Sequence, residues 1–194
     1  MELILDLNKR YTYADYLTWL ESCRCEIING VVSKIPPIHT AHAEVCENLM
    51  YFLYSYIKKY SCKCKVFSSI FDVRFPKHGD TADDKIDTVV QPDICVVCDL
   101  SKLDERGCCG APDMIAEILS PATLKRDVTE KFALYEEHGV KEYWIVHPKD
   151  EAITVFLLQE NGKYDNGTVY EFEEKVPVHI FDNYLIDLND IFEK

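Results

Sequence analysis

Hydrophobic positions along the chain recur at helical spacing in two long segments, residues 40–60 and 124–139. Spacing of three and four residues places such positions on one side of a helix, so each segment is predicted to bury one face. The second segment ends at Gly139, a residue that readily adopts the left-handed conformation of a helix C-cap. The first stripe consists of Val45, Leu49, Phe52 and Tyr56, and the second of Val128, Phe132 and Tyr135.

Shorter apolar runs predict β-strands between and after these helices. Asn29-Gly30, in the sequence CEIINGVVSKI, separates two apolar runs and is typical of a tight hairpin turn. A short helix is expected at 12–21, with Thr12 as its N-cap. Further strands are expected within 63–75, 91–97, 114–120, 142–148 and 152–158. This order predicts an α/β fold with a mixed central sheet flanked by helices and with N-terminal and C-terminal β-hairpin additions.

The length of the chain favours one domain, taken as 1–194. No apolar run approaches the ~20 residues that a membrane-spanning helix needs. The N-terminus lacks the basic region and long apolar core of a signal peptide. The expectation is therefore a cytoplasmic protein that does not enter a membrane.

The nine cysteines fit a reducing compartment, because their number is odd and several lie in strand-like runs. Cys95 and Cys98 have the CxxC spacing of a zinc site, but an extended strand points their thiols to opposite faces. Buried free thiols are therefore favoured over zinc. Cys46 lies four residues after His42, which offers a thiol nucleophile and base as an alternative. No oxyanion motif accompanies that pair, and Cys46 lies next to the apolar stripe.

Two carboxylates stand where carboxylates are costly. Asp93 lies at the start of the apolar run QPDICVV, and Glu117 lies inside MIAEILS. Both faces of the second strand are apolar, so it is predicted to be central and covered on both sides. An unpaired buried carboxylate costs several kcal/mol or becomes protonated, so Glu117 needs a cation or a metal ion as partner.

Lys131 is the cation that the sequence offers. It falls within the arc of Val128 and Phe132, whereas the charges of Arg126, Glu130 and Glu137 point away as solvated charges do. The alternative is a lysine whose stem packs on the core while its ammonium reaches water. For Asp93, the alternative is ordinary turn chemistry after a proline.

Together, two carboxylates on neighbouring strands and one lysine beside them are the parts of a metal-dependent phosphodiesterase. Asp93 and Glu117 would hold Mg²⁺, or Mn²⁺, through hard oxygen ligands. The ion would polarise a phosphate and lower the pKa of a bound water. Lys131 would stabilise the charge that develops on the phosphate.

Long stretches of the chain resemble the Uma-type restriction endonuclease family, which belongs to the PD-(D/E)XK nuclease superfamily. The most specific stretches are QPDICVVCD, GAPDMIAEILSPAT and RDVTEKFALYEEHGVKEYWIVHP. The resemblance extends upstream through YTYADYLTW, CEIINGVV and HTAHAEVCENL, and so covers nearly the whole chain. It implies a restriction-endonuclease-like fold and a metal-dependent endonuclease acting on DNA.

The resemblance also assigns residues. Asp93 matches the acid of the PD motif, and Glu117 matches the second acid. The superfamily pattern places a lysine two residues later, where this sequence has Leu119. The resemblance therefore implies a lysine on the following helix: Lys131, with Lys125 as the weaker alternative. His42 and Glu44 match a region where such folds add supporting polar groups, although a helix-surface pair also explains them.

The net charge of −13 argues against broad attraction to a polyanion, so binding of DNA needs a local basic patch, an oligomer groove or metal ions. The alternative function is a decayed nuclease-like fold that serves as a protein-interaction or nucleic-acid-binding module. A homodimer is also expected, because Tyr143 and Trp144 lie in an apolar strand near a predicted sheet edge, and because nucleases often need two sites to cut two strands.

Overall fold

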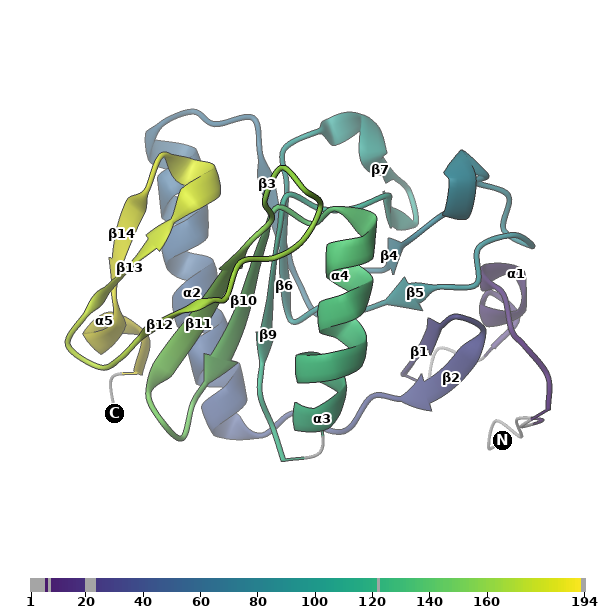
Figure 1. Ribbon diagram of the computed structural model, residues 1–194, viewed down its shortest axis with the longest axis horizontal. Helices are drawn as coiled ribbons and strands as arrows, with labels where there is room; N and C mark the ends of the chain where they lie inside the picture. Colours follow the sequence, from purple (N-terminus) through teal and green to yellow (C-terminus); the bar gives the residue numbers. More distant parts are fainter. Residues whose placement is uncertain (1–5, 7, 20–23, 122, 193–194) are drawn as a thin grey trace.

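The computed structural model describes residues 6, 8–19, 24–121 and 123–192, which form two mixed sheets and a C-terminal hairpin flanked by helices (Figure 1). The main sheet has the strand order β12-β11-β10-β9-β6-β3. In that order its strands are Thr168–Tyr170, Ala152–Leu157, Glu142–His147, Met114–Ile118, Ile94–Val97 and Lys65–Ser68. Strands β9 and β10 are parallel, so the chain between them must cross over the sheet, which it does as a helix.

The second sheet has the order β2-β1-β5-β4-β8-β7 and begins with the predicted hairpin. Its strands are Val31–Lys34, Cys25–Ile28, Val89–Val90, Val73–Arg74, Gly107–Cys109 and Leu103–Asp104. Asn29 and Gly30 both have positive φ angles, 52° and 77°, as the tight turn of a twisted hairpin requires. A further hairpin near the C-terminus pairs β13 (Lys175–Val178) with β14 (Tyr184–Asp187).

The long helix α2 (Thr40–Lys59) and the helix that ends in α4 (Phe132–His138) cover opposite faces of the main sheet (Figure 1). Between β9 and α4 the chain forms α3 (Leu124–Arg126) and a π-helical segment (Asp127–Lys131). The remaining helices are α1 (Tyr13–Tyr16), α5 (Leu188–Phe192) and the short turns Lys77–Gly79, Leu100–Lys102 and His179–Phe181. Helix α1 is shorter than predicted, and residues 20 and 21 of that prediction lie outside the described residues.

Alternate residues of the central strands pack in opposite directions. In β9, Met114 and Ala116 join the cluster beneath α2, whereas Ile115 joins the cluster beneath α4. In β10, Trp144 joins the cluster beneath α2 and Tyr143 joins the cluster beneath α4. Both faces of these strands are buried, which explains why the sequence reads as continuous apolar runs. Glu117 follows the alternation and points to the α4 side.

Helix α2 buries a slightly different stripe from the one its pattern predicts. Leu53 and Ile57 are buried together with Val45 and Leu49, whereas Phe52 and Tyr56 only border the core. The buried residues keep a constant four-residue step, which forms a line inclined by about 26° to the helix axis. The large rings beside that line remain partly exposed.

The helix after β9 departs from the predicted pattern at Val128. This side chain is 38% exposed, although the sequence places it in the buried stripe. The cause is the π-helical segment Asp127–Lys131, since i→i+5 bonding adds a residue to the turn and rotates what precedes it. Tyr135 is fully buried, as predicted, and Phe132 packs at the edge of the same cluster.

The expected edge position of Tyr143 and Trp144 is wrong. Strand β10 pairs with β9 on one side and with β11 on the other, and both side chains are 0% exposed. Residues buried inside one chain cannot form an interface, so the structure removes the aromatic basis for a homodimer.

The expectation that the cysteines are free thiols is wrong for one pair, because Cys64 and Cys98 form a disulfide. They flank the antiparallel pair Lys65 and Val97, which brings them opposite each other. Cys95 and Cys98 belong to different clusters, so the CxxC spacing does not bring their thiols together. Within the described ranges, no helix combines the length and hydrophobicity needed to cross a membrane.

Gly107 in β8 lies very close to the backbone of Asp72. Its φ is 126°, and a Cβ atom there would lie 2.2 Å from the carbonyl oxygen of Asp72. We expect Gly107→Ala to lower the free energy of unfolding by about 2–5 kcal/mol, because a left-handed backbone cost and an overpacking cost add.

Gly79→Ala is the matched control. Its φ is 77°, but no heavy atom lies within 4 Å of the added carbon, so only the backbone cost of about 1–2 kcal/mol is expected. Urea unfolding of both variants gives the comparison. Equal losses would contradict the close approach at Asp72.

Candidate active site

A small cavity of about 40 Å³ brings four of the predicted residues together. Asp93, Glu117, Lys131 and His42 all line it, from the ends of β6 and β9, the π-helical segment and the start of α2. The apolar segment from Ile35 to Ile38 forms part of its wall. The cavity therefore lies where both sheets and two helices meet.

The two predicted acids lie opposite each other on neighbouring strands. Strands β6 and β9 are antiparallel, with Ile94 opposite Ala116. Continued by one residue, this register places Asp93 opposite Glu117, and directly opposed residues point to the same side of a sheet. The backbone N–H of Ile118 donates to Asp93 Oδ2 over 2.8 Å, which fixes the carboxylate at the strand end.

Lys131 reaches this point from the helix side. Its side chain is 3% exposed, and its Nζ lies 2.8 Å from Glu117 Oε1. Tyr135, one turn further along, donates its hydroxyl to the same Glu117 oxygen over 2.6 Å. The ammonium is thus buried against the acid and is not directed to water.

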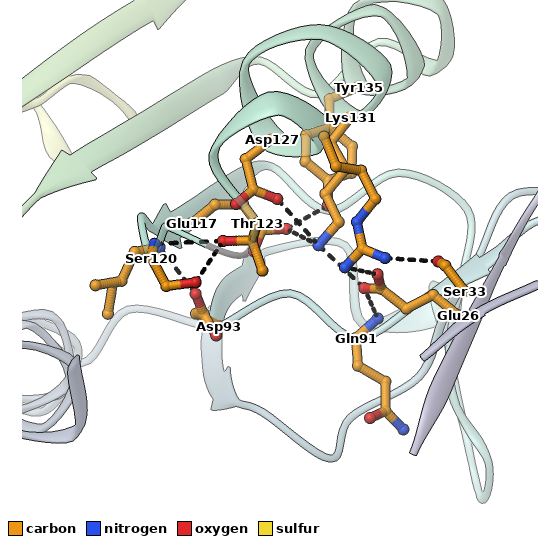
Figure 2. Close-up of polar contacts among 12 residues, drawn as sticks. Glu26, Ser33, Gln91, Asp93, Glu117, Ser120, Thr123, Asp127, Lys131 and Tyr135 are labelled. Carbon is orange, nitrogen blue, oxygen red and sulfur yellow. Dashed lines mark hydrogen bonds and ion pairs between the residues drawn. The ribbon is translucent and has the colours of Figure 1, made fainter. Parts of the chain in front are cut away.

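Glu26 is a member of the site that the sequence reasoning missed. It comes from β1 of the second sheet, is 1% exposed and lies 3.0 Å from Lys131 Nζ (Figure 2). Its Oε1 also accepts from the backbone N–H of Gln91 over 3.0 Å. The available signal was the one that identified Glu117, an acid inside an apolar run, here CEII.

Asp127 is the second missed residue. It is 2% exposed, and its Oδ1 lies 3.8 Å from Lys131 Nζ. The π-helical segment begins at Asp127 and ends at Lys131, so the wide turn directs both side chains inward. Their four-residue separation was visible in the sequence, but only the lysine stood out against the apolar stripe.

Arg126 also belongs to the cluster, contrary to its predicted solvent-facing position. Its guanidinium lies 2.8 Å from Glu26 Oε2 and donates to the hydroxyl of Ser33 in β2. The same π-helical turn accounts for the difference. Arg126 and Lys131 together provide two cations for the buried carboxylates of Glu26, Glu117 and Asp127.

His42 supports Asp93 from the first turn of α2. Its Nε2 lies 3.0 Å from Asp93 Oδ2, and its Nδ1 is buried without a hydrogen-bond partner. Cys46, one turn later, contacts the backbone carbonyl of Asp93. Burial raises the pKa of the Cys46 thiol to about 12, so the thiol stays protonated and the nucleophile alternative is not supported.

Two predicted residues lie outside the cavity. Glu44 is exposed on α2, as expected of a helix-surface pair. Lys125 is exposed on α3 and is not among the residues that line the cavity. Of the two lysines that the sequence offered, only Lys131 contacts Glu117.

Burial sets the electrostatics of the cluster. It raises the pKa of Glu117 to about 8, an effect that Lys131 opposes and that Asp127, Asp93 and Glu26 reinforce. Burial also raises the pKa of Asp127. For Lys131, burial acts to lower the pKa, but the surrounding carboxylates outweigh it and raise the pKa above its usual value. Glu117 therefore takes up a proton more readily than Lys131 loses one.

The carboxylates of the cavity supply donors that suit a divalent cation. Carboxylate oxygens are the ligands that Mg²⁺ and Mn²⁺ prefer, and Asp127 Oδ1 is buried without a hydrogen-bond partner. Among the described residues, no three His, Cys, Asp or Glu side chains form a complete metal site. Mg²⁺ is usually held by one or two carboxylates together with waters and substrate phosphates. Asp93 and Glu117 fit a hydrated ion of that kind.

The family model described as "Uma2: Putative restriction endonuclease" matches residues 13–188. The chain belongs to the Uma2 family. Its resemblance to Uma-type endonucleases, inferred above from sequence stretches, is confirmed.

The Uma2 chain also matches the crystal structure of a putative nuclease belonging to DUF820 from Anabaena variabilis ATCC 29413. The TM-score is 0.73 at 23% sequence identity, with 94% of this chain and 97% of that chain covered. At this identity the likeness shows the fold, and it confirms the predicted α/β architecture. No curated protein matches the chain.

The raised pKa of Glu117 predicts how the stability of the metal-free protein depends on pH. Between an unfolded pKa near 4.5 and a folded pKa of about 8, the folded state holds a proton that the unfolded state has lost. The contribution of Glu117 to the free energy of unfolding is therefore fully present below about pH 4.5 and is lost as pH rises towards 8. We expect Glu117→Gln to flatten this part of the profile.

The measurement is urea unfolding in EDTA at pH 5, 6, 7 and 8. Glu136→Gln is the control, because that carboxylate lies outside the cluster, pairs with Lys163 and has a lowered pKa. A Glu117→Gln profile parallel to that of the wild type would contradict a protonated Glu117.

Proposed function

We propose that this Uma2 protein is a metal-dependent nuclease that hydrolyses phosphodiester bonds of DNA, with Mg²⁺ or Mn²⁺ as cofactor. The observation that carries the proposal is the opposed pair of Asp93 and Glu117 with the buried ammonium of Lys131 2.8 Å from Glu117. The family is described as one of restriction endonucleases and the matching structure as a nuclease, which supports the same reaction class.

In this proposal, Asp93 and Glu117 hold the cation. When bound, the ion supplies Lewis-acid polarisation of the phosphate and a bound water that ionises near neutral pH. Asp93 is already oriented for this role by the N–H of Ile118 and by His42. Glu117 must lose its proton, and a divalent cation beside it favours the ionised form.

Lys131 stabilises negative charge on the phosphate as the bond breaks. Its ammonium has three donors, and Glu117 and Glu26 lie within 3.0 Å of it. These two acids hold the ammonium at the cavity wall and leave a donor for a phosphate oxygen. Asp127 and Arg126 are positioning residues in this scheme, since they act through Lys131 and Glu26.

A second function has its own support. The net charge of −13 repels nucleic acid at long range, and Lys131 is already paired with carboxylates. Both observations favour a nuclease-like binding module that has lost catalysis. Cleavage and metal binding, measured separately, distinguish the two functions.

Substitution of each lysine tests which one is catalytic. We expect Lys131→Ala to reduce the rate of DNA cleavage in Mg²⁺ or Mn²⁺ by about 10²–10³, the usual cost of removing a preorganised electrostatic donor. Lys125→Ala should cleave at the wild-type rate, because Lys125 is exposed and outside the cavity. A linear single strand and a duplex of the same sequence serve as substrates.

Removal of a buried cation leaves its acids unpaired and costs about 3–5 kcal/mol, so Lys131→Ala is assayed well below its own melting temperature. Circular dichroism at the assay temperature verifies that it is folded. If Lys125→Ala were inactive and folded Lys131→Ala active, the assignment of the catalytic lysine would be reversed.

Metal binding is tested without catalysis. A cation that binds only the folded state adds about 2.7 kcal/mol of stability at a hundredfold excess over its Kd. We expect Mn²⁺ to raise the melting temperature of the wild type and of Lys131→Ala, but not of Asp93→Asn. The Asp72→Asn variant is the control, since Asp72 is an acid outside this cavity. An undiminished shift in Asp93→Asn would exclude Asp93 as a ligand.

A further inference from the structure

The lysines of this acidic chain are concentrated in one place. The protein has 34 acidic and 21 basic residues, yet residues 48–71 contain four lysines and not one Asp or Glu. This stretch covers most of α2, the turn that follows it and the edge strand β3. It is the local basic patch that DNA binding by such a chain requires.

Three of these lysines line one groove. Lys58, at the end of α2, lies across from Lys63 in the turn and Lys65 at the start of β3, around a hollow of about 530 Å³. All three are exposed, and none forms an ion pair with a described carboxylate. We call this hollow the lysine groove. Its lining residues all lie between Tyr54 and Phe67, so no acid borders it.

Two aromatic residues, Tyr54 and Phe67, line the groove together with the lysines. Tyr54 is 51% exposed, and the Nζ of Lys58 lies 5.1 Å from its ring centroid. Phe67 forms part of the opposite wall. Exposed rings among lysines are the arrangement that binds unpaired nucleic acid, because bases stack on the rings while cations contact the phosphates.

A stacked pair of rings links the wall of the groove to a second cleft. The ring of Phe67 stacks on that of Phe71, with centroids 3.9 Å apart. Phe71 lines this second cleft of about 730 Å³, together with Tyr16, Trp19 and Arg106 and with three acids, Asp72, Asp104 and Glu105.

This cleft shares two lining residues, Arg24 and Gln91, with the cavity of Asp93 and Glu117. Gln91 Oε1 is buried there without a hydrogen-bond partner. The second cleft thus adjoins the cavity.

Ordinary structural roles explain only part of this pattern. A lysine at the C-terminus of α2 interacts favourably with the helix dipole, which accounts for Lys58. A lysine on an edge strand hinders pairing with other chains, which accounts for Lys65. Neither role explains Lys63 or the absence of acids from the whole stretch. A polyanionic ligand explains all of these features.

We propose that the lysine groove binds the backbone of a single-stranded part of the DNA substrate, remote from the bond that is cut. This inference rests on the proposed function. From His42 to Lys58 the helix rises about 24 Å, at ~1.5 Å per residue. At the ~3.4 Å per nucleotide of a stacked strand, about seven nucleotides would span this distance, and an extended single strand would need fewer.

The test measures binding of a fluorescent 20-residue oligo(dT) in EDTA over a range of salt concentrations. In the variant with Lys58, Lys63 and Lys65 each changed to Gln, the slope of log K against log salt should fall by about 2, since each single-strand contact contributes about 0.7. Changing Lys85, Lys163 and Lys175 to Gln gives the same change in net charge. These lysines are exposed and each faces a carboxylate, so the slope should not change.

Tyr54→Ala provides an independent readout, with an expected loss of affinity for oligo(dT) of about 5- to 100-fold from the lost stacking. Hydrolysis of bis(p-nitrophenyl) phosphate, which is too small to reach the groove, should be unchanged in the groove variants. Loss of binding confined to duplex DNA would overturn the single-strand assignment. A groove variant that binds like the control variant would overturn the groove itself.

Failure of the proposed function gives a different result. If the wild type binds oligo(dT) through the groove but cleaves neither DNA nor the small diester with Mg²⁺ or Mn²⁺, the nuclease proposal fails and the groove stands. If the wild type and the triple variant cleave DNA at equal rates at limiting substrate, the nuclease proposal stands and the groove proposal fails.

Discussion

One buried ammonium joins the main sheet, the second sheet and the helix that crosses between β9 and β10. Lys131 contacts Glu117 from one sheet and Glu26 from the other, and Asp127 lies beside it. Charges removed from water are tolerated only when they are closely paired, so each of these side chains restricts where the others can lie. The small cavity is lined by this set of charges and by Asp93. Folding and the proposed chemistry therefore depend on the same charge balance.

The sequence predicted the parts of the site that stand out against apolar surroundings. Glu117 and Lys131 each break a hydrophobic face, and an unpaired buried charge demands a partner, so their meeting follows from burial alone. Glu26 breaks a face in the same way but lies in a strand far along the chain, and only tertiary structure brings the second sheet to Lys131. Asp127 and Arg126 could not be placed, because a regular helical wheel fails where the hydrogen bonding becomes π-helical. Tyr143 and Trp144 were misplaced for a related reason: local pattern does not tell which strand is added to an edge.

The charge distribution separates two requirements that conflict within one small protein. A buried carboxylate cluster suits a cation but repels phosphate. A lysine surface attracts phosphate, but next to the carboxylates it would neutralise their charge. Helix α2 keeps them apart, with His42 near one end and Lys58 near the other. Over such a distance, exposed charges are screened from each other at physiological salt, where the Debye length is about 8 Å. The acidic residues elsewhere in the chain then favour attraction of a polyanion to the lysine groove.

The π-helical segment has a consequence for the length of the helix after β9. Core packing of Tyr135 fixes the rotational phase of α4, whereas the buried carboxylates fix that of Asp127. In a regular α-helix each residue advances the direction of the side chain by about 100°. Without the extra residue of the π-helical turn, Tyr135 and Asp127 could not both point inward. Deleting one of the three residues between Asp127 and Lys131 would leave the core contacts of α4 intact and rotate Asp127 and Arg126 around the helix axis. In this helix the number of residues therefore matters as much as their identity. The extra residue of the π-helical turn lets α4 pack on the core while Asp127 and Arg126 face the cavity.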